Sequence, residues 1–276
     1  MEAIIKQDKL FQNWIKCSHA LKLLQSQLER FIGVELEKFH QVLLRECGMG
    51  RCVNKCQFTK WKPGSSKIPP LDCQVCSRWR DEILAHHTSP HGKVMWKNSK
   101  PHLWSQEIME VAKVYMPEGH KNHKSLSDFD IAALLCLMNQ CKYFKKFEIG
   151  ALCERVSCVR NKVMHCPRFD LKREDLHNYL NHIKDLGKKL EYHDEGFKSL
   201  SEKIDETVAQ DASGCNLPRM MLGKLKTKLQ KEKELLVPVR KALGHLCAQA
   251  TSIKKLLGRN CVFGFLNTCS KSQHIA

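Results

Sequence analysis

Residues 10–31 read LFQNWIKCSHALKLLQSQLERF, and their apolar side chains recur at alternating steps of four and three residues. This spacing keeps one face of an α-helix apolar and is typical of a heptad seam. We therefore predict one long helix over residues 5–45 that packs on another helix. That partner can belong to the same chain, which is the commoner arrangement, or to a second copy. The seam consists of Leu10, Trp14, Cys17, Leu21, Leu24, Leu28 and Phe31.

Similar three- and four-residue apolar steps recur as far as residue 257, so the sequence predicts an all-α protein with almost no strand. Residues 171–190 form the clearest amphipathic helix. Residues 46–125 are rich in glycine and proline, which predicts a loop-rich insertion with short helices at 77–87 and 103–115. We divide the chain into a long amphipathic N-terminal helix (1–46), a Cys-rich region (47–94), a helical core (95–195), basic C-terminal helices (196–257) and a tail (258–276).

The chain is strongly basic, with a formal net charge of +17 over 276 residues. Residues 215–276 carry twelve lysines and arginines against two acidic residues, and residues 51–124 carry thirteen against six. Clustered positive charge attracts polyanions, so RNA or another polyanion is the expected partner. Patterns such as G-x-S-x-G, H-E-x-x-H and the P-loop do not occur, which argues against the classical hydrolase and nucleotide-binding classes.

The sequence favours the cytoplasm or the nucleus over secretion. No apolar run is long enough to cross a membrane, and residues 1–11 lack the apolar core of a signal peptide. In a reducing compartment the fifteen cysteines do not predict a disulfide framework. Buried free thiols are the default for those within helical patterns, such as Cys17, Cys136, Cys141 and Cys247.

Four other cysteines have the spacing of metal ligands. Cys52-x3-Cys56 is followed after sixteen residues by Cys73-x2-Cys76, and two close pairs joined by a longer loop can supply four thiolates to zinc. We predict that their sulfurs converge within roughly 4 Å of one another, as a tetrahedral site requires. Such a structural zinc could order a region that has little core of its own. Cys47 is an alternative ligand, as are His86, His87 and His91, while buried free cysteines remain the competing interpretation.

A second candidate site lies in residues 158–165, which read CVRNKVMH. Arg160 can grip a phosphate through its fork of donors, and His165 can transfer a proton near neutral pH. The surrounding residues 141–163 are predicted to be helical, with Pro167 ending the run. Upstream, Ser127 and Asp130 form a predicted capping pair at the start of a helix. The competing interpretation is a surface arginine and a histidine that caps the helix end.

The R-N-x-x-x-H pattern of Arg160, Asn161 and His165, the Asp-then-Leu-Leu helix at 129–138 and the amphipathic helix after it resemble the HEPN superfamily of helical domains. The resemblance covers roughly residues 95–195. It implies a HEPN-like helical bundle, a dimer, and metal-independent endoribonuclease activity at a basic cleft. In that activity Arg160 would stabilise the phosphate charge, His165 would act as general acid or base, and Asn161 would hold the geometry.

The whole sequence also resembles an uncharacterised vertebrate protein family that carries a domain of unknown function. Two functions are therefore compared below. The first is an RNA-binding, RNA-cleaving HEPN-like protein in which Arg160 and His165 lie close together on a basic surface. On a regular helix, five residues place the two side chains about 140° apart, so they could share one phosphate only if the helix ends early or a second chain completes the site. The second function is a non-enzymatic, self-associating interaction scaffold.

Overall fold

The structure is a computed structural model of the chain, and it describes residues 2–58, 68–71, 73–89 and 94–209. The chain divides into two units, residues 1–211 and 212–276, and all the described residues lie in the first. Within them the regular structure is helical, with an isolated bridge between His87 and Cys141 and no strand. The predicted all-α class is thus confirmed for this part of the chain. Predictions for residues 210–276, including the tail and Cys247, lie outside the described residues.

Seven α-helices are described: α1 (Glu2–Cys47), α2 (Gln74–Ala85), α3 (Ile108–Ala112), α4 (Ile131–Gln140), α5 (Gly150–Met164), α6 (Arg173–Glu191) and α7 (Leu200–Ala209). Between them lie the 3-10 turns η1 (Trp96–Asn98), η2 (Pro101–Leu103), η3 (Lys113–Tyr115), η4 (Leu126–Asp128), η5 (Lys142–Phe147) and η6 (Glu195–Phe197). No helix of the described residues is long and apolar enough to cross a membrane.

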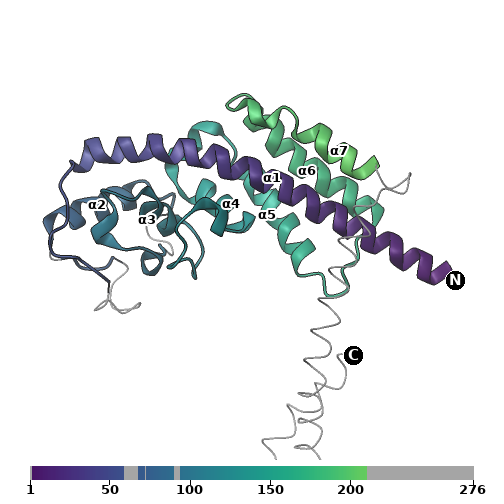
Figure 1. Cartoon of the computed structure of the whole chain (residues 1–276), viewed down its shortest axis with the longest axis horizontal. Helices are drawn as coiled ribbons and strands as arrows, with labels where there is room; N and C mark the ends of the chain where they lie inside the picture. Colours follow the sequence, from purple (N-terminus) through teal and green to yellow (C-terminus); the bar gives the residue numbers. More distant parts are fainter. Residues whose placement is uncertain (1, 59–67, 72, 90–93, 210–276) are drawn as a thin grey trace, which may run out of the picture. The chain divides into compact units, whose positions relative to one another are not determined.

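The long N-terminal helix is confirmed, and its seam is covered by the same chain. Helix α1 packs on α5, α6 and α7 along its first part and on α2, α3 and α4 along the rest (Figure 1). The seam residues from Cys17 to Phe31 are at most 2% exposed. Near the N-terminus, the indole of Trp14 donates to the carbonyl of Val163 at 2.7 Å, which joins α1 to the end of α5. The apolar seam is therefore buried against helices of the same chain, and it gives no reason to expect a second copy.

Two of the predicted helices are interrupted in the structure. The segment 103–115 begins at the end of η2 and contains only the five-residue α3 followed by the 3-10 turn η3. The segment 141–163 breaks at Glu148, whose backbone is left-handed with φ of 55°, and α5 begins at Gly150. The helix predicted at 77–87 begins earlier, at Gln74, and ends at Ala85.

The loop-rich region is anchored by aromatic residues as well as by the cysteines. Trp79, Trp96 and Trp104 are almost completely buried, while Trp61 lies outside the described residues. The ring of Phe58 lies 6.0 Å from Trp96 and 5.9 Å from Trp104, centroid to centroid. Burial of large aromatic rings thus connects the loop after α1 to the segment before α3.

Candidate functional site

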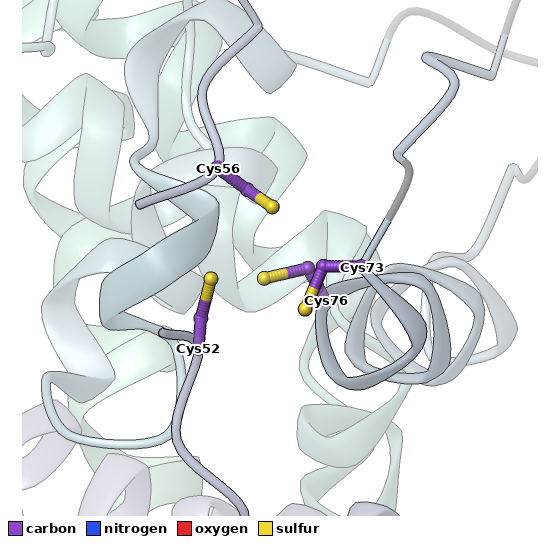
Figure 2. A group of neighbouring side chains, drawn as sticks. All are labelled: Cys52, Cys56, Cys73 and Cys76. Atoms are coloured by element: carbon purple, nitrogen blue, oxygen red, sulfur yellow. The ribbon is translucent and has the colours of Figure 1, made fainter. Parts of the chain in front are cut away.

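The four predicted cysteines come together in one cluster. The sulfurs of Cys52, Cys56, Cys73 and Cys76 all lie within 4.8 Å of one another, and they point toward a common centre (Figure 2). A tetrahedral zinc site with Zn–S bonds near 2.3 Å needs sulfurs about 3.8 Å apart, so the cluster has to contract by less than about 1 Å. The predicted ligand set is therefore brought together by the fold, at a slightly wider spacing than expected.

A different local backbone structure positions each pair of cysteines. Cys52 and Cys56 flank a tight turn in which Lys55 has a left-handed backbone, with φ of 47°. The ring nitrogen Nδ1 of His102 donates to the carbonyl of Cys56 at 3.0 Å and fixes the far end of that turn. Cys73 is the N-cap residue of α2, and Cys76 lies in its first turn. The start of α2 thus places both residues of the second pair beside the turn that carries the first pair.

The electrostatics of the cluster favour at least one thiolate near neutral pH. Burial raises the pKa of the Cys52 thiol, but hydrogen bonds from the backbone of Cys56 and from neighbouring thiols bring it down to about 7. Burial and the Cys52 thiolate raise the pKa of Cys56 to about 11, and the same causes raise that of Cys76. One thiol of the group thus ionises at the expense of the others.

The alternative ligands do not join this cluster. Cys47 is the last residue of α1, where burial raises its thiol pKa to about 12, and it is not among the four converging sulfurs. His86 and His87 also lie outside the group, and His91 is outside the described residues. Among the described residues the Cys52–Cys76 cluster is the one group of metal-ligand type, so Cys153, Cys158, His165 and Cys166 form no second site there.

Arg160 lies at the second candidate site, and its guanidinium is already held by two neighbours. One nitrogen forms an ion pair with the Asp130 carboxylate at 2.6 Å, and another donates to the Asn161 side chain at 3.1 Å. Asp130 also caps α4 by accepting the backbone N–H of Ala133 at 2.9 Å. The arginine side chain keeps about a fifth of its surface exposed. Asp130 and Asn161 therefore fix the guanidinium while part of it faces solvent.

His165 is exposed at the C-terminal end of α5 and is separated from Arg160. The helix stays regular through Met164, and the backbone N–H of His165 bonds to the carbonyl of Asn161 at 3.0 Å. Helix α5 therefore does not end between Arg160 and His165, as the pair would need in order to share one phosphate within one chain. No hydrogen bond or ion pair joins Arg160 to His165 in the described part of the chain, and the two remain about 140° apart around one helix.

Comparison with known proteins places the chain in a family. Residues 6–262 match the family described as "Domain of unknown function (DUF4559)". The chain belongs to the DUF4559 family. A mouse protein, "Uncharacterized protein CXorf38 homolog", is 34% identical over 184 residues, which cover 64% of this chain and 57% of the mouse protein. The aligned part thus spans little more than half of that relative. No solved structure matches the chain.

In this DUF4559 domain, the sequence-based interpretation missed two features of the polar site. Asp130 caps α4 as predicted, but without Ser127, and its ion pair with Arg160 was not predicted. Ser125 and Asp128 form a separate capping box at η4. The second feature is the pair formed by His120 and His123, whose Nδ1 atoms lie 2.9 Å apart. Their three-residue spacing just before Asp130 was the available signal.

Asp130 gives a direct test of how this DUF4559 domain holds its arginine. We expect Asp130→Ala to lower the free energy of unfolding by about 0.5–2 kcal/mol, because the first turn of α4 loses its N-cap. Urea denaturation followed by circular dichroism measures the change. Asp185→Ala is the matched control, since Asp185 is an exposed carboxylate of α6, and we expect it to change stability little. Equal stability of the two variants would contradict the capping role of Asp130.

Proposed function

We propose that this chain is a HEPN-like, RNA-binding protein with metal-independent RNA-cleaving activity. The observation that carries the proposal is the guanidinium of Arg160, which is fixed by Asp130 and Asn161 and still reaches solvent at 22% exposure of its side chain. An arginine held in this way loses little side-chain entropy when it binds a phosphate. The strong positive charge of the chain supports a polyanionic partner. The order of the Asp-capped α4, the motif helix α5 and the amphipathic α6 agrees with the HEPN resemblance.

We further propose that the four-cysteine cluster holds a structural zinc ion. The donor set is the softest that proteins offer, and thiolate ligands select zinc among the abundant divalent ions. The ion would tie the loop after α1 to the start of α2. Its role in this proposal is to stabilise the fold, because all four ligand positions are filled by protein and none is left for substrate.

Self-association remains part of the proposal through the HEPN resemblance alone. With the α1 seam covered by the same chain, a dimer would have to form through another surface. In such a dimer His165 of one copy could approach Arg160 of the other, which a single α5 does not allow. The cytoplasm or the nucleus is the proposed location.

RNA binding is tested by comparing Arg160→Ala with Arg155→Ala. Both variants remove one positive charge from α5, but Arg155 is exposed on another face of the helix. We expect Arg160→Ala to weaken binding of a fluorescein-labelled single-stranded RNA about tenfold, as loss of a charge-assisted hydrogen bond implies. It should also reduce the slope of log K against log salt by about 0.7, the value for one phosphate contact on a single strand. Fluorescence anisotropy at several salt concentrations measures both quantities.

The two functions compared for this chain predict different results. If Arg155→Ala and Arg160→Ala weaken RNA binding equally, the attraction is general and Arg160 has no special role. If the wild-type protein binds no RNA at low salt, the RNA-binding proposal fails. The non-enzymatic interaction scaffold then becomes the better interpretation.

A further inference from the structure

Buried polar side chains hold the backbone of the loop of residues 117–124 in place. Asn98 is 2% exposed, and its amide oxygen accepts the backbone N–H groups of Gly119 and His120, each at 3.1 Å. Its amide nitrogen donates to the carbonyl of Pro117 at 2.6 Å. Gly119 turns the chain with φ of 110°, a conformation that favours glycine. A single buried side chain thus fixes the entry of the loop.

A buried ion pair fixes the rest of the loop. Lys113 is fully buried, and its ammonium group contacts the Glu110 carboxylate at 2.6 Å. The same ammonium donates to the carbonyls of Lys121 at 3.1 Å and His123 at 3.3 Å. Lysines are almost never fully buried, and a buried ion pair is a weak source of stability compared with apolar packing. The arrangement is better explained by a need to hold the backbone of this surface loop in one position.

The fixed loop presents two histidines that share a hydrogen bond. The Nδ1 atoms of His120 and His123 lie 2.9 Å apart, and both rings pack edge-on against Phe129 with centroids 5.1 Å away. One Nδ1–H donates and the other Nδ1 accepts. The donor ring therefore keeps an unprotonated Nε2, which can accept a proton, while the acceptor ring keeps an Nε2–H, which can donate one. A neutral pair of this kind contains a base and an acid side by side.

The charged groups around the pair connect it to Arg160. Burial lowers the pKa of His120, and His123 and Lys113 lower it further, while Asp130 opposes them. The neutral form is thus favoured near pH 7. Both rings pack on Phe129, and the next residue, Asp130, is the carboxylate that binds Arg160, so the histidine pair and the guanidinium contact consecutive residues of the chain. Asp128 also interacts with His123, but its carboxylate is used by the backbone N–H groups of Lys124 and Ser125.

We propose that His120 and His123 are the acid–base pair of the RNA-cleaving site, with Arg160 as its phosphate-binding group. The inference rests on the proposed RNA-cleaving function and assigns the proton transfers to this pair in place of His165. The unprotonated Nε2 takes the proton of a ribose 2′-hydroxyl, whose oxygen attacks the adjacent phosphorus. The bond from phosphorus to the 5′-oxygen breaks, and that oxygen takes the proton of the other Nε2–H. The products are a 2′,3′-cyclic phosphate and a 5′-hydroxyl, so no further reactant is needed.

The test compares the full-length protein with His120→Asn/His123→Asn, His165→Asn and His177→Asn. The last is a control, because His177 is an exposed histidine of α6. A labelled single-stranded RNA and the same sequence with 2′-O-methyl riboses serve as substrates, in buffer without added metal ions or chelator. We expect the double variant to cleave RNA at least 100-fold more slowly, the lower range for general acid–base catalysis, while RNA affinity changes only a few-fold. His177→Asn should cleave at close to the wild-type rate, and the 2′-O-methyl strand should stay intact.

Failure of this inference can be distinguished from failure of the proposed function. If the double variant cleaves as fast as wild type, or if His165→Asn alone abolishes cleavage, the histidine pair is not the acid–base pair and the RNA function stands. If wild type binds RNA without cleaving it, the inference is wrong and RNA binding alone remains. If wild type does not bind RNA, both the inference and the proposed function are wrong. If circular dichroism shows that the double variant is misfolded, the single variants His120→Asn and His123→Asn are measured instead. The inference requires each to lower the cleavage rate at least tenfold. Wild-type cleavage rates in both would overturn it.

Discussion

Replacing Cys73 and Cys76 by serine is expected to remove one zinc ion per chain and to destabilise the described unit by several kcal/mol. Zinc-finger peptides gain about 10–16 kcal/mol from their metal, but those peptides have no other core. Here α1 and α4–α6 retain a large apolar core, so the loss should be smaller. It should be concentrated in the segments that the cluster joins, residues 47–58 and 73–85. Metal analysis of the purified protein and thermal denaturation measure the two effects.

The matched control for this experiment is Cys158→Ser. Cys158 is an exposed thiol of α5 outside the cluster, so its replacement should leave zinc content and melting temperature unchanged. Treating wild type with a strong chelator should reproduce the cysteine double variant, and adding zinc should restore the melting temperature of wild type alone. A wild-type protein that is purified without stoichiometric zinc and gains no stability when zinc is added would exclude the metal site. The four residues would then be free thiols in a loop junction.

The sequence predicts well the features that depend on the spacing of neighbouring residues. The α1 seam follows from steps of three and four residues, and the cluster of four cysteines follows from two short pairs. A helix directly after the second pair was also expected, at 77–87, although α2 begins within that pair, at Gln74. In each case the predictive pattern lies within a few neighbouring residues. Burial of the apolar face or convergence of the thiols then follows when the chain folds.

Sequence spacing could not predict contacts between residues that are distant in the chain, or a charged side chain that is buried. Arg160 meets Asp130 across thirty positions, and nothing in either segment specifies that contact. The ring of Phe58 packs against Trp96 and Trp104, which lie far along the chain from it. Lys113 lies in a segment that reads as an ordinary amphipathic helix, where a lysine is expected to face solvent. Its burial instead divides that helix and fixes the loop that carries the histidine pair.

Lys113→Met is expected to lower the free energy of unfolding by about 3–5 kcal/mol, because it leaves the Glu110 carboxylate buried without its counter-ion. Urea denaturation monitored by circular dichroism measures the loss. Lys198→Met is the matched control: Lys198 pairs with Glu195 at the same three-residue spacing, but both side chains are exposed, so we expect no measurable change. Similar values for the two variants would show that the Lys113 pair is solvated in solution.

A second variant separates the stabilising role of the ion pair from its positioning role. Glu110→Leu/Lys113→Met replaces both charges by apolar groups of similar size, so it should recover much of the lost stability. It cannot restore the hydrogen bonds to the carbonyls of Lys121 and His123. Amide hydrogen exchange in residues 117–124 should therefore stay faster than in wild type although global stability returns. If exchange there returned to the wild-type rate as well, the loop would be held by Asn98 and the apolar contacts of Phe129 alone, and the buried lysine would have no part in positioning the two histidines.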